Sequence, residues 1–301
     1  MATHEQHPEP SNPLGLDGIE FIEYATTQPQ ALGAVLQAMG FQAVARHRSR
    51  EVMLYRQGTM NLIVNAHPEA LPGLVLPKSV PTLSAIALRV RDAGFAWQHA
   101  LELGAWEMPT RASAMELNIP GIHGVGDSLI YFVDRHGDFS IYDVDFIPLP
   151  GAVREPPAIA GLHYFGVVQS IFGDRTADWV DFYRQLFGFR VLPSGEYFGI
   201  LPKGTLLESP CQRFYLQLIE PPEGADDIQW DERLLRVGLG APNIPAAVQA
   251  LRARGVVFID REPVQATERG ALTQIHLGGV TFELVASHLA VQTAQPAKGP
   301  A

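Results

Sequence analysis

The chain has one cysteine, few basic residues and no long hydrophobic run. Cys211 is the single cysteine in 301 residues, which excludes an intramolecular disulfide and a cysteine-rich zinc site. Lysine and arginine total 22 against 32 aspartate and glutamate residues, for a net charge of −10, and this balance disfavours binding to nucleic acid or to anionic membranes. No apolar stretch reaches the roughly 18 residues of a membrane span. Because residues 1–13 also lack the features of a signal peptide, we expect a soluble, cytoplasmic protein.

What is present is the composition of an ordinary globular protein, 47% hydrophobic and 18% charged. The length predicts about two domains. Four prolines in the twelve residues 147–158 indicate a linker. Residues 1–13 and 289–301 are too polar to bury a core and are expected to be disordered tails. The predicted domains are therefore 14–146 and 159–288.

Each predicted domain contains two copies of one pattern, a β-type run, a helical run and further β-type runs. A βαβββ module leaves one face of its sheet uncovered, so the modules should pair. We therefore expect an α+β fold of four βαβββ modules, paired into two domains with cupped, barrel-like mixed sheets. The expected opening strands are 18–25, 83–90, 161–168 and 235–240, and the expected helices are 30–39, 93–103, 176–186 and 244–254. The expected later strands are 52–55, 61–65, 128–134, 140–146, 197–201, 214–220, 271–276 and 280–286.

Four such modules in two pairs resemble the vicinal-oxygen-chelate (glyoxalase/bleomycin-resistance/dioxygenase) superfamily. Within it, several strings resemble 4-hydroxyphenylpyruvate dioxygenase, over roughly residues 16–287. Residues 55–65 also resemble the C-terminal half of some bacterial 3-dehydroshikimate dehydratases. The strings are Gly-Ile-Glu-Phe-Ile-Glu-Tyr-Ala at 18–25, Gly-Asp-Ser-Leu-Ile-Tyr-Phe-Val-Asp at 126–134, Gly-Leu-His at 161–163, the helix ending at 179–189, Ser-Pro at 209–210, Leu-Thr-Gln-Ile-His at 272–276 and Val-Thr-Phe-Glu-Leu-Val at 280–285.

The resemblance implies a non-haem Fe(II) site held by two histidines and one glutamate in the C-terminal domain. An aryl 2-oxo acid would chelate the iron, and O₂ would drive its oxidative decarboxylation with ring hydroxylation. By the motif match, His163 is the first ligand and Glu283 is the carboxylate ligand. Gln274 and Ser209 match residues that contact the substrate.

The second histidine is missing. By register it falls at Val237, and valine cannot bind a metal. His276 is a candidate replacement, because a spacing of two places it on the same face of a strand as Gln274. A histidine that merely lines the cavity remains the other interpretation.

Two further departures weaken the match to the dioxygenases. The segment between Asp260 and Ala271 is short, and because a polar stretch begins soon after Glu283 we expect no counterpart of the C-terminal helix that closes their site. A non-redox ligand-binding or regulatory protein of the same fold is therefore an alternative, as is a module associated with a dehydratase. The natural substrate and the presence of a homo-oligomer are left open.

Overall fold

The computed structural model describes residues 12–67, 80–109, 117–137, 139–193, 199, 204–222, 230–260 and 265–287. Most of the two expected tails and, apart from Gly199, the strand expected at 197–201 lie outside these residues. None of the helices in the described part of the chain has the length and apolar character that a membrane crossing requires.

Residues 19–148 form an eight-stranded sheet, here called sheet A, in the order β6-β7-β5-β1-β4-β3-β2-β8. Its strands are β1 (Ile19–Ala25), β2 (Gln42–His47), β3 (Val52–Gln57), β4 (Met60–Asn65), β5 (Thr82–Arg89), β6 (Gly121–His123), β7 (Leu129–Val133) and β8 (Phe146–Pro148). The helices of this half are α1 (Pro29–Ala38), α2 (Ala93–Glu102) and the short α3 (Ile141–Asp145), with the 3₁₀ turn η2 (Val125–Asp127).

Residues 163–286 form a seven-stranded sheet, sheet B, in the order β10-β11-β12-β9-β13-β15-β14. Its strands are β9 (His163–Ser170), β10 (Arg190–Val191), β11 (Thr205–Glu208), β12 (Tyr215–Ile219), β13 (Arg233–Ala241), β14 (Gly270–Leu272) and β15 (Phe282–Ala286). Helices α4 (Thr176–Phe187) and α5 (Ile244–Arg252) follow β9 and β13, and the 3₁₀ turn η3 (Ile159–Gly161) precedes β9.

The two sheets repeat one arrangement. The central pair is antiparallel in both, β1 with β5 and β9 with β13, and each central strand has a parallel neighbour on its other side. This pattern is what paired βαβββ modules produce, so the expected α+β fold with two mixed sheets is confirmed. Both sheets have free edge strands among the described residues, so neither closes into a barrel.

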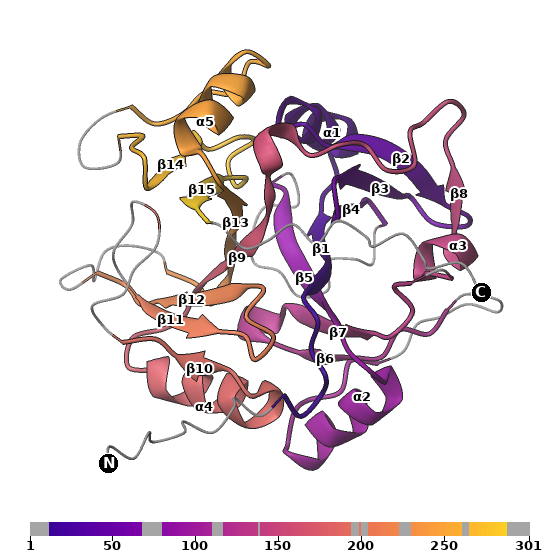
Figure 1. Ribbon diagram of the computed structural model, residues 1–301. Helices are drawn as coiled ribbons and strands as arrows, with labels where there is room; N and C mark the ends of the chain where they lie inside the picture. The colour runs from indigo at the N-terminus through magenta and orange to yellow at the C-terminus, as the bar shows by residue number, and fades with distance from the viewer. Residues whose placement is uncertain are drawn as a thin grey trace, which may run out of the picture.

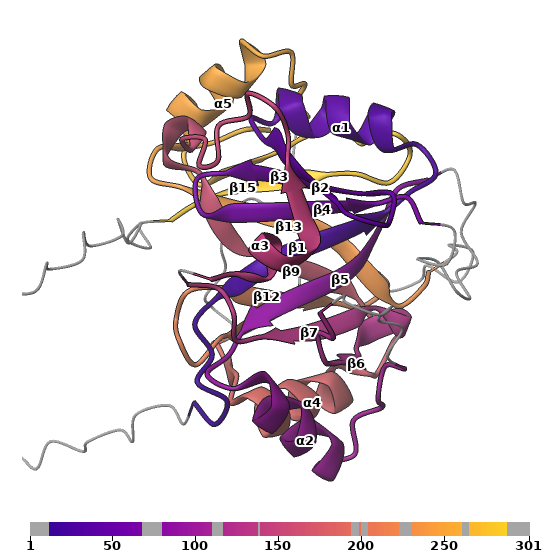
Figure 2. The same ribbon diagram turned by 90° about the vertical axis from the view of Figure 1, so that its right-hand side faces the viewer.

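One large hydrophobic cluster joins the two halves. One cluster of buried side chains contains residues of both sheets and of helices α1, α2, α4 and α5. Figure 2 places α1 and α5 at one end of the molecule and α2 and α4 at the other, while Figure 1 places β1 and β5 beside β9 and β13. The faces of the sheets that do not contribute to this core carry the polar groups described below.

Local sequence signals set several helix ends. Asp92 begins α2 by accepting a hydrogen bond from the backbone N–H of Phe95, and Asn243 does the same for Ala246 in α5. Helix α4 ends at Gly188, whose φ of 78° lies in the left-handed region that glycine tolerates.

The prediction of a strand at 140–146 was wrong. Ser140 and Asp143 form a capping box, in which the Asp143 carboxylate accepts hydrogen bonds from the N–H and the hydroxyl of Ser140, each at 2.9 Å. Residues 141–145 therefore form α3, and only Phe146 begins a strand. The expected linker also contributes to the sheet, because Ile147 and Pro148 belong to β8, which pairs with β2.

Candidate functional site

Glu283 on β15 and Arg236 on β13 form a buried ion pair on one face of sheet B. The Arg236 Nε donates to the Glu283 Oε2 at 3.0 Å, and the two residues are 9% and 3% exposed. The register aligns Gly238 of β13 with Glu283, so Arg236, two residues from Gly238, extends over the same face. We call this face the C-terminal cup.

Val237 does not occupy a position in this cup. It pairs with Phe282 on β15 and Val167 on β9, and all three side chains are buried in the hydrophobic core on the other face. The prediction that Val237 stands at the second ligand position was wrong by one residue. The side chain that β13 presents to Glu283 is the guanidinium of Arg236.

His163 lies at the beginning of β9 on the same face, opposite Gly240 of β13. Its Nδ1 lies 3.0 Å from the Gly161 carbonyl oxygen and its Nε2 lies 3.1 Å from the Ser287 hydroxyl, so both ring nitrogens have partners. Burial lowers the pKa of His163, an effect that the hydrogen bond to Gly161 partly offsets. A neutral imidazole with both nitrogens hydrogen-bonded is the resulting state.

The described residues pack closely around Glu283. A Cβ added to Gly199 would lie 2.4 Å from the Glu283 Oε1, so the backbone of Gly199 packs directly against the carboxylate. Among the described residues, the cavity beside Glu283 has a volume of about 20 Å³, with Phe165, Tyr215 and Gly238 in its wall. This volume holds about one water molecule.

The other predicted site residues do not lie beside Glu283 and His163. His276 pairs with Val280, whose side chain lies in the core on the face opposite Glu283. Cross-strand partners share a face, so the structure does not bring His276 to Glu283 and His163. Gln274 is exposed beyond the end of β14. Ser209 is 1% exposed, and its hydroxyl lies 3.3 Å from the Cys211 sulfur and accepts the Phe214 N–H, all within the turn between β11 and β12.

These residues do not fit a ferrous iron. A 2-His-1-carboxylate site needs three ligands on one face, and the described residues contain no group of three histidine, cysteine, aspartate or glutamate side chains that could hold a metal ion. His163 and Glu283 share a face, but Glu283 is bound to a permanently positive guanidinium. A divalent cation would have to compete with that charge at close range.

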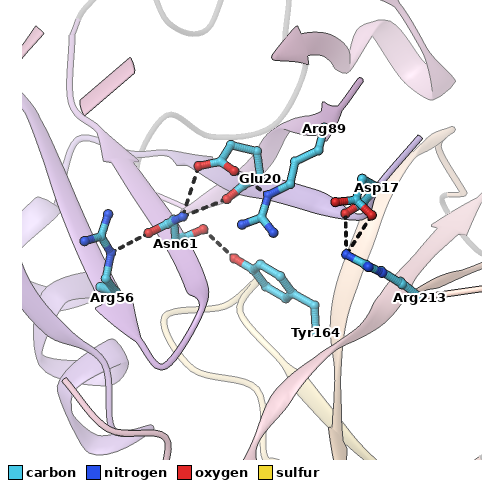
Figure 3. A network of polar contacts seen from close by, with 7 residues as sticks. All are labelled: Asp17, Glu20, Arg56, Asn61, Arg89, Tyr164 and Arg213. Carbon is cyan, nitrogen blue, oxygen red and sulfur yellow. Dashed lines mark hydrogen bonds and ion pairs between the residues drawn. The ribbon is translucent and has the colours of Figure 1, made fainter. Parts of the chain in front are cut away.

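Sheet A contains a comparable ion pair (Figure 3). The Arg89 Nε donates to the Glu20 Oε2 at 2.5 Å, and Asn61 donates to the backbone oxygen of Glu20 at 2.9 Å. Arg56 in turn donates to Asn61 at 2.7 Å. The Tyr164 hydroxyl of β9 donates to the Asn61 carbonyl oxygen, so this network also connects the two sheets. Both halves therefore hold an arginine–glutamate pair, with both partners buried in the C-terminal half and a half-buried arginine on a buried glutamate in the N-terminal half.

A much larger cavity than the one beside Glu283 lies over the face of sheet A that bears Phe21 and Glu23, here called the N-terminal cup. Its volume is about 1400 Å³, and it extends to Arg175 and Trp179 of the C-terminal half. Glu23 is 9% exposed in its wall, and burial raises the pKa of the Glu23 carboxyl. No functional role was predicted for Glu23 from the sequence.

Two signals in the sequence could have identified the missed residues. Arg236 is a charged residue inside the apolar run Leu-Leu-Arg-Val-Gly-Leu-Gly, and Glu23 lies inside the strand Ile-Glu-Phe-Ile-Glu-Tyr-Ala. A charged side chain in a buried strand is costly unless it is paired, so each position indicates a specific polar environment.

Comparison with known proteins shows which family this chain resembles. Residues 10–147 match the glyoxalase-type family described as "Hydroxyphenylpyruvate dioxygenase, HPPD, N-terminal". The 4-hydroxyphenylpyruvate dioxygenase of Pseudomonas sp. (strain P.J. 874) is 41% identical over 224 residues, which are 72% of this chain and 62% of that protein. The enzyme of the same name from Pseudomonas aeruginosa is 34% identical over 278 residues, 86% of this chain and 74% of that protein. A 3-dehydroshikimate dehydratase from Pseudomonas aeruginosa is 34% identical over 67% of this chain and 32% of its own length.

The fold agrees with a solved structure as well. A mutant of 4-hydroxymandelate synthase from Streptomyces coelicolor matches with a TM-score of 0.67 and 15% identity, covering 91% of this chain and 93% of that one. The fold is therefore that of the glyoxalase class. The sequence similarity is more specific, and the chain belongs to the 4-hydroxyphenylpyruvate dioxygenase family, whose named members are dioxygenase enzymes. It spans 62% of the length of the Pseudomonas sp. relative.

Proposed function

We propose that this chain is a member of the dioxygenase family that binds a small molecule without using ferrous iron. The observation that carries the proposal is the buried pair of Arg236 and Glu283, which places a guanidinium against the carboxylate that the resemblance assigns to the metal. A guanidinium stays charged at every physiological pH, so it satisfies the carboxylate permanently.

Two further observations support this proposal. His163 has hydrogen-bond partners at both ring nitrogens, and the small cavity beside Glu283 leaves no space for an aryl 2-oxo acid between the described residues. Glu20 and Arg89 form a half-buried ion pair between the same residue types in the other half, where the resemblance implies no metal site.

The second candidate is the reaction of the relatives, the oxidative decarboxylation of an aryl 2-oxo acid with O₂ at ferrous iron. It is favoured by the named dioxygenases at 41% and 34% identity, and by the position of His163 and Glu283 on one face of the sheet. In this case the two residues would be ligands, and a third ligand would have to come from elsewhere.

The experiment compares the wild type with Arg236→His, which replaces the guanidinium by a potential metal ligand. Iron content is measured after anaerobic loading with Fe(II) and desalting, and oxygen uptake is measured with 4-hydroxyphenylpyruvate. We expect no stoichiometric iron and no substrate-dependent oxygen uptake in the wild type. Arg236→His should gain iron, because it would place two imidazoles and one carboxylate on one face.

A control variant, Arg236→His combined with Glu283→Gln, should lose the gained iron. Wild-type protein that retains about one iron per chain, loses it in His163→Ala, and consumes oxygen with 4-hydroxyphenylpyruvate would overturn the proposal in favour of the second candidate.

A further inference from the structure

We propose that the N-terminal cup is a binding site for a small aromatic amine, whose ammonium group pairs with Glu23. This site is separate from the C-terminal cup. The cavity of about 1400 Å³ over sheet A is larger than the 300–1000 Å³ typical of small-molecule sites. It therefore offers far more space than the cavity of about 20 Å³ that the described residues form beside Glu283.

Glu23 is held in place for such a contact. On β1 it lies between β4 and β5, and its Oε1 accepts hydrogen bonds from the Ser84 hydroxyl at 2.9 Å and the Asn65 amide at 3.2 Å. Both bonds end on the same oxygen, and the described residues provide no hydrogen bond to Oε2. A buried carboxylate with one oxygen fixed and the other available is suited to a charged donor.

The wall around Glu23 is aromatic. The rings of Phe21 and Tyr131 lie 5.9 Å apart at their centroids, and Phe146 lines the same cavity. These rings provide an apolar surface on which an aromatic ligand can stack, at favourable centroid separations of 4.5–7 Å. His123 also lines this cavity.

The net negative charge of the cavity lining favours a positively charged ligand. Six aspartate and glutamate side chains lie in the described lining against three arginines and no lysine. Such a cavity raises the local concentration of cations over anions. An aromatic amine would pair with the carboxylate, stack on the rings and be attracted by the net negative charge of the lining. An aromatic acid of the same size would be repelled by that charge.

The test is isothermal titration of the full chain at pH 8 with two probes that share one ring. Tyramine carries the ammonium group, and 3-(4-hydroxyphenyl)propionate carries a carboxylate in its place. We expect tyramine to bind one per chain and the acid to bind more weakly. Glu23→Gln, which keeps the shape and the acceptor oxygen for Ser84 and Asn65, should weaken tyramine binding by about ten- to a hundredfold.

Asp178→Asn is the matched control, because Asp178 is an exposed carboxylate of the same cavity whose charge is already balanced by its ion pair with Arg175. Tyramine affinity should change less than twofold in this variant. Tyramine affinity should be equally unaffected by Arg236→His, so the outcome is independent of the iron experiment.

Ser84→Ala keeps the Glu23 charge and provides a second test if Glu23→Gln does not fold. It should weaken tyramine binding measurably. Absence of tyramine binding at millimolar concentration, equal or tighter binding of the acid, or unchanged affinity in Glu23→Gln or in Ser84→Ala would overturn the proposal.

Discussion

At the scale of single residues, the buried carboxyl of Glu23 links stability to pH. Burial raises the pKa of Glu23 more than its hydrogen bonds to Ser84 and Asn65 and the charge of Arg50 lower it. The folded state therefore holds this proton more tightly than the unfolded state. Stability should fall as the pH rises from the ordinary glutamate pKa to the raised one, by about 1.4 kcal/mol for each unit of the shift.

The prediction is that Glu23→Gln is more stable than the wild type at pH 8 and about equal to it at pH 4, because the amide never has to be ionised. Urea unfolding at pH 4, 6 and 8 measures the difference in unfolding free energy between the two proteins. A difference that stays constant over this range would contradict the assignment of the raised pKa. Comparing the variant with the wild type at each pH cancels the contribution of His163 and His276, whose lowered pKa values act in the opposite direction.

The candidate metal site was predictable only in part, for a reason that also lies at single residues. His163 and Glu283 could be located from motifs because each lies in a short string with a distinctive pattern. Arg236 was missed because counting along β13 placed Val237 in the cup. That strand has register shifts on both sides, between Leu234 and Arg236 and between Gly238 and Leu239, and such irregularities interrupt the alternation of faces that a sequence count assumes.

At the scale of elements, the strands β13 and β15 depend on the ion pair between them. Arg236 and Glu283 are both buried, so removing one partner leaves an unpaired charge in the protein interior. We predict that Arg236→Met and Glu283→Met each lower the unfolding free energy by about 3–5 kcal/mol.

The double variant Arg236→Met/Glu283→Met should be less destabilised than the sum of the two single variants, because neither charge remains. Chemical unfolding of all four proteins gives the coupling energy. Additive losses would show that the two side chains do not interact in solution as they do in the structure.

The elements themselves could be predicted to different degrees. The four helices α1, α2, α4 and α5 were predictable within two residues, because their apolar spacing and the glycines after them are local signals. Helix α3 was not, since Ile-Tyr-Asp-Val-Asp alternates as a strand does and the capping box outweighed that alternation. Strand β2 is not among the expected strands, although β3 pairs with it on one side and β8 on the other.

At the scale of the whole molecule, the two halves are joined by a shared core and by specific polar contacts. Tyr164 of β9 donates to Asn61 of β4, and Arg213 forms an ion pair with Asp17 at 2.7 Å (Figure 3). The buried cluster that contains the four main helices belongs to both sheets. An interface of this kind makes separate unfolding of either half unfavourable, because each would expose the face that the other covers.

Gly126 tests this coupling directly. It lies in η2 with a φ of 59°, and a Cβ at this position would lie 1.7 Å from the backbone oxygen of Glu232 in the other half. Gly126→Ala should therefore strain the backbone and also push the two halves apart, where overpacking costs about 1–3 kcal/mol. Gly104→Ala is the matched control, because its φ of 89° imposes a similar strain while a Cβ there meets nothing within 4 Å. We predict a single calorimetric transition in all three proteins, with a clearly larger decrease in melting temperature for Gly126→Ala than for Gly104→Ala. Two separate transitions, of which only one shifts, would show that the halves unfold independently.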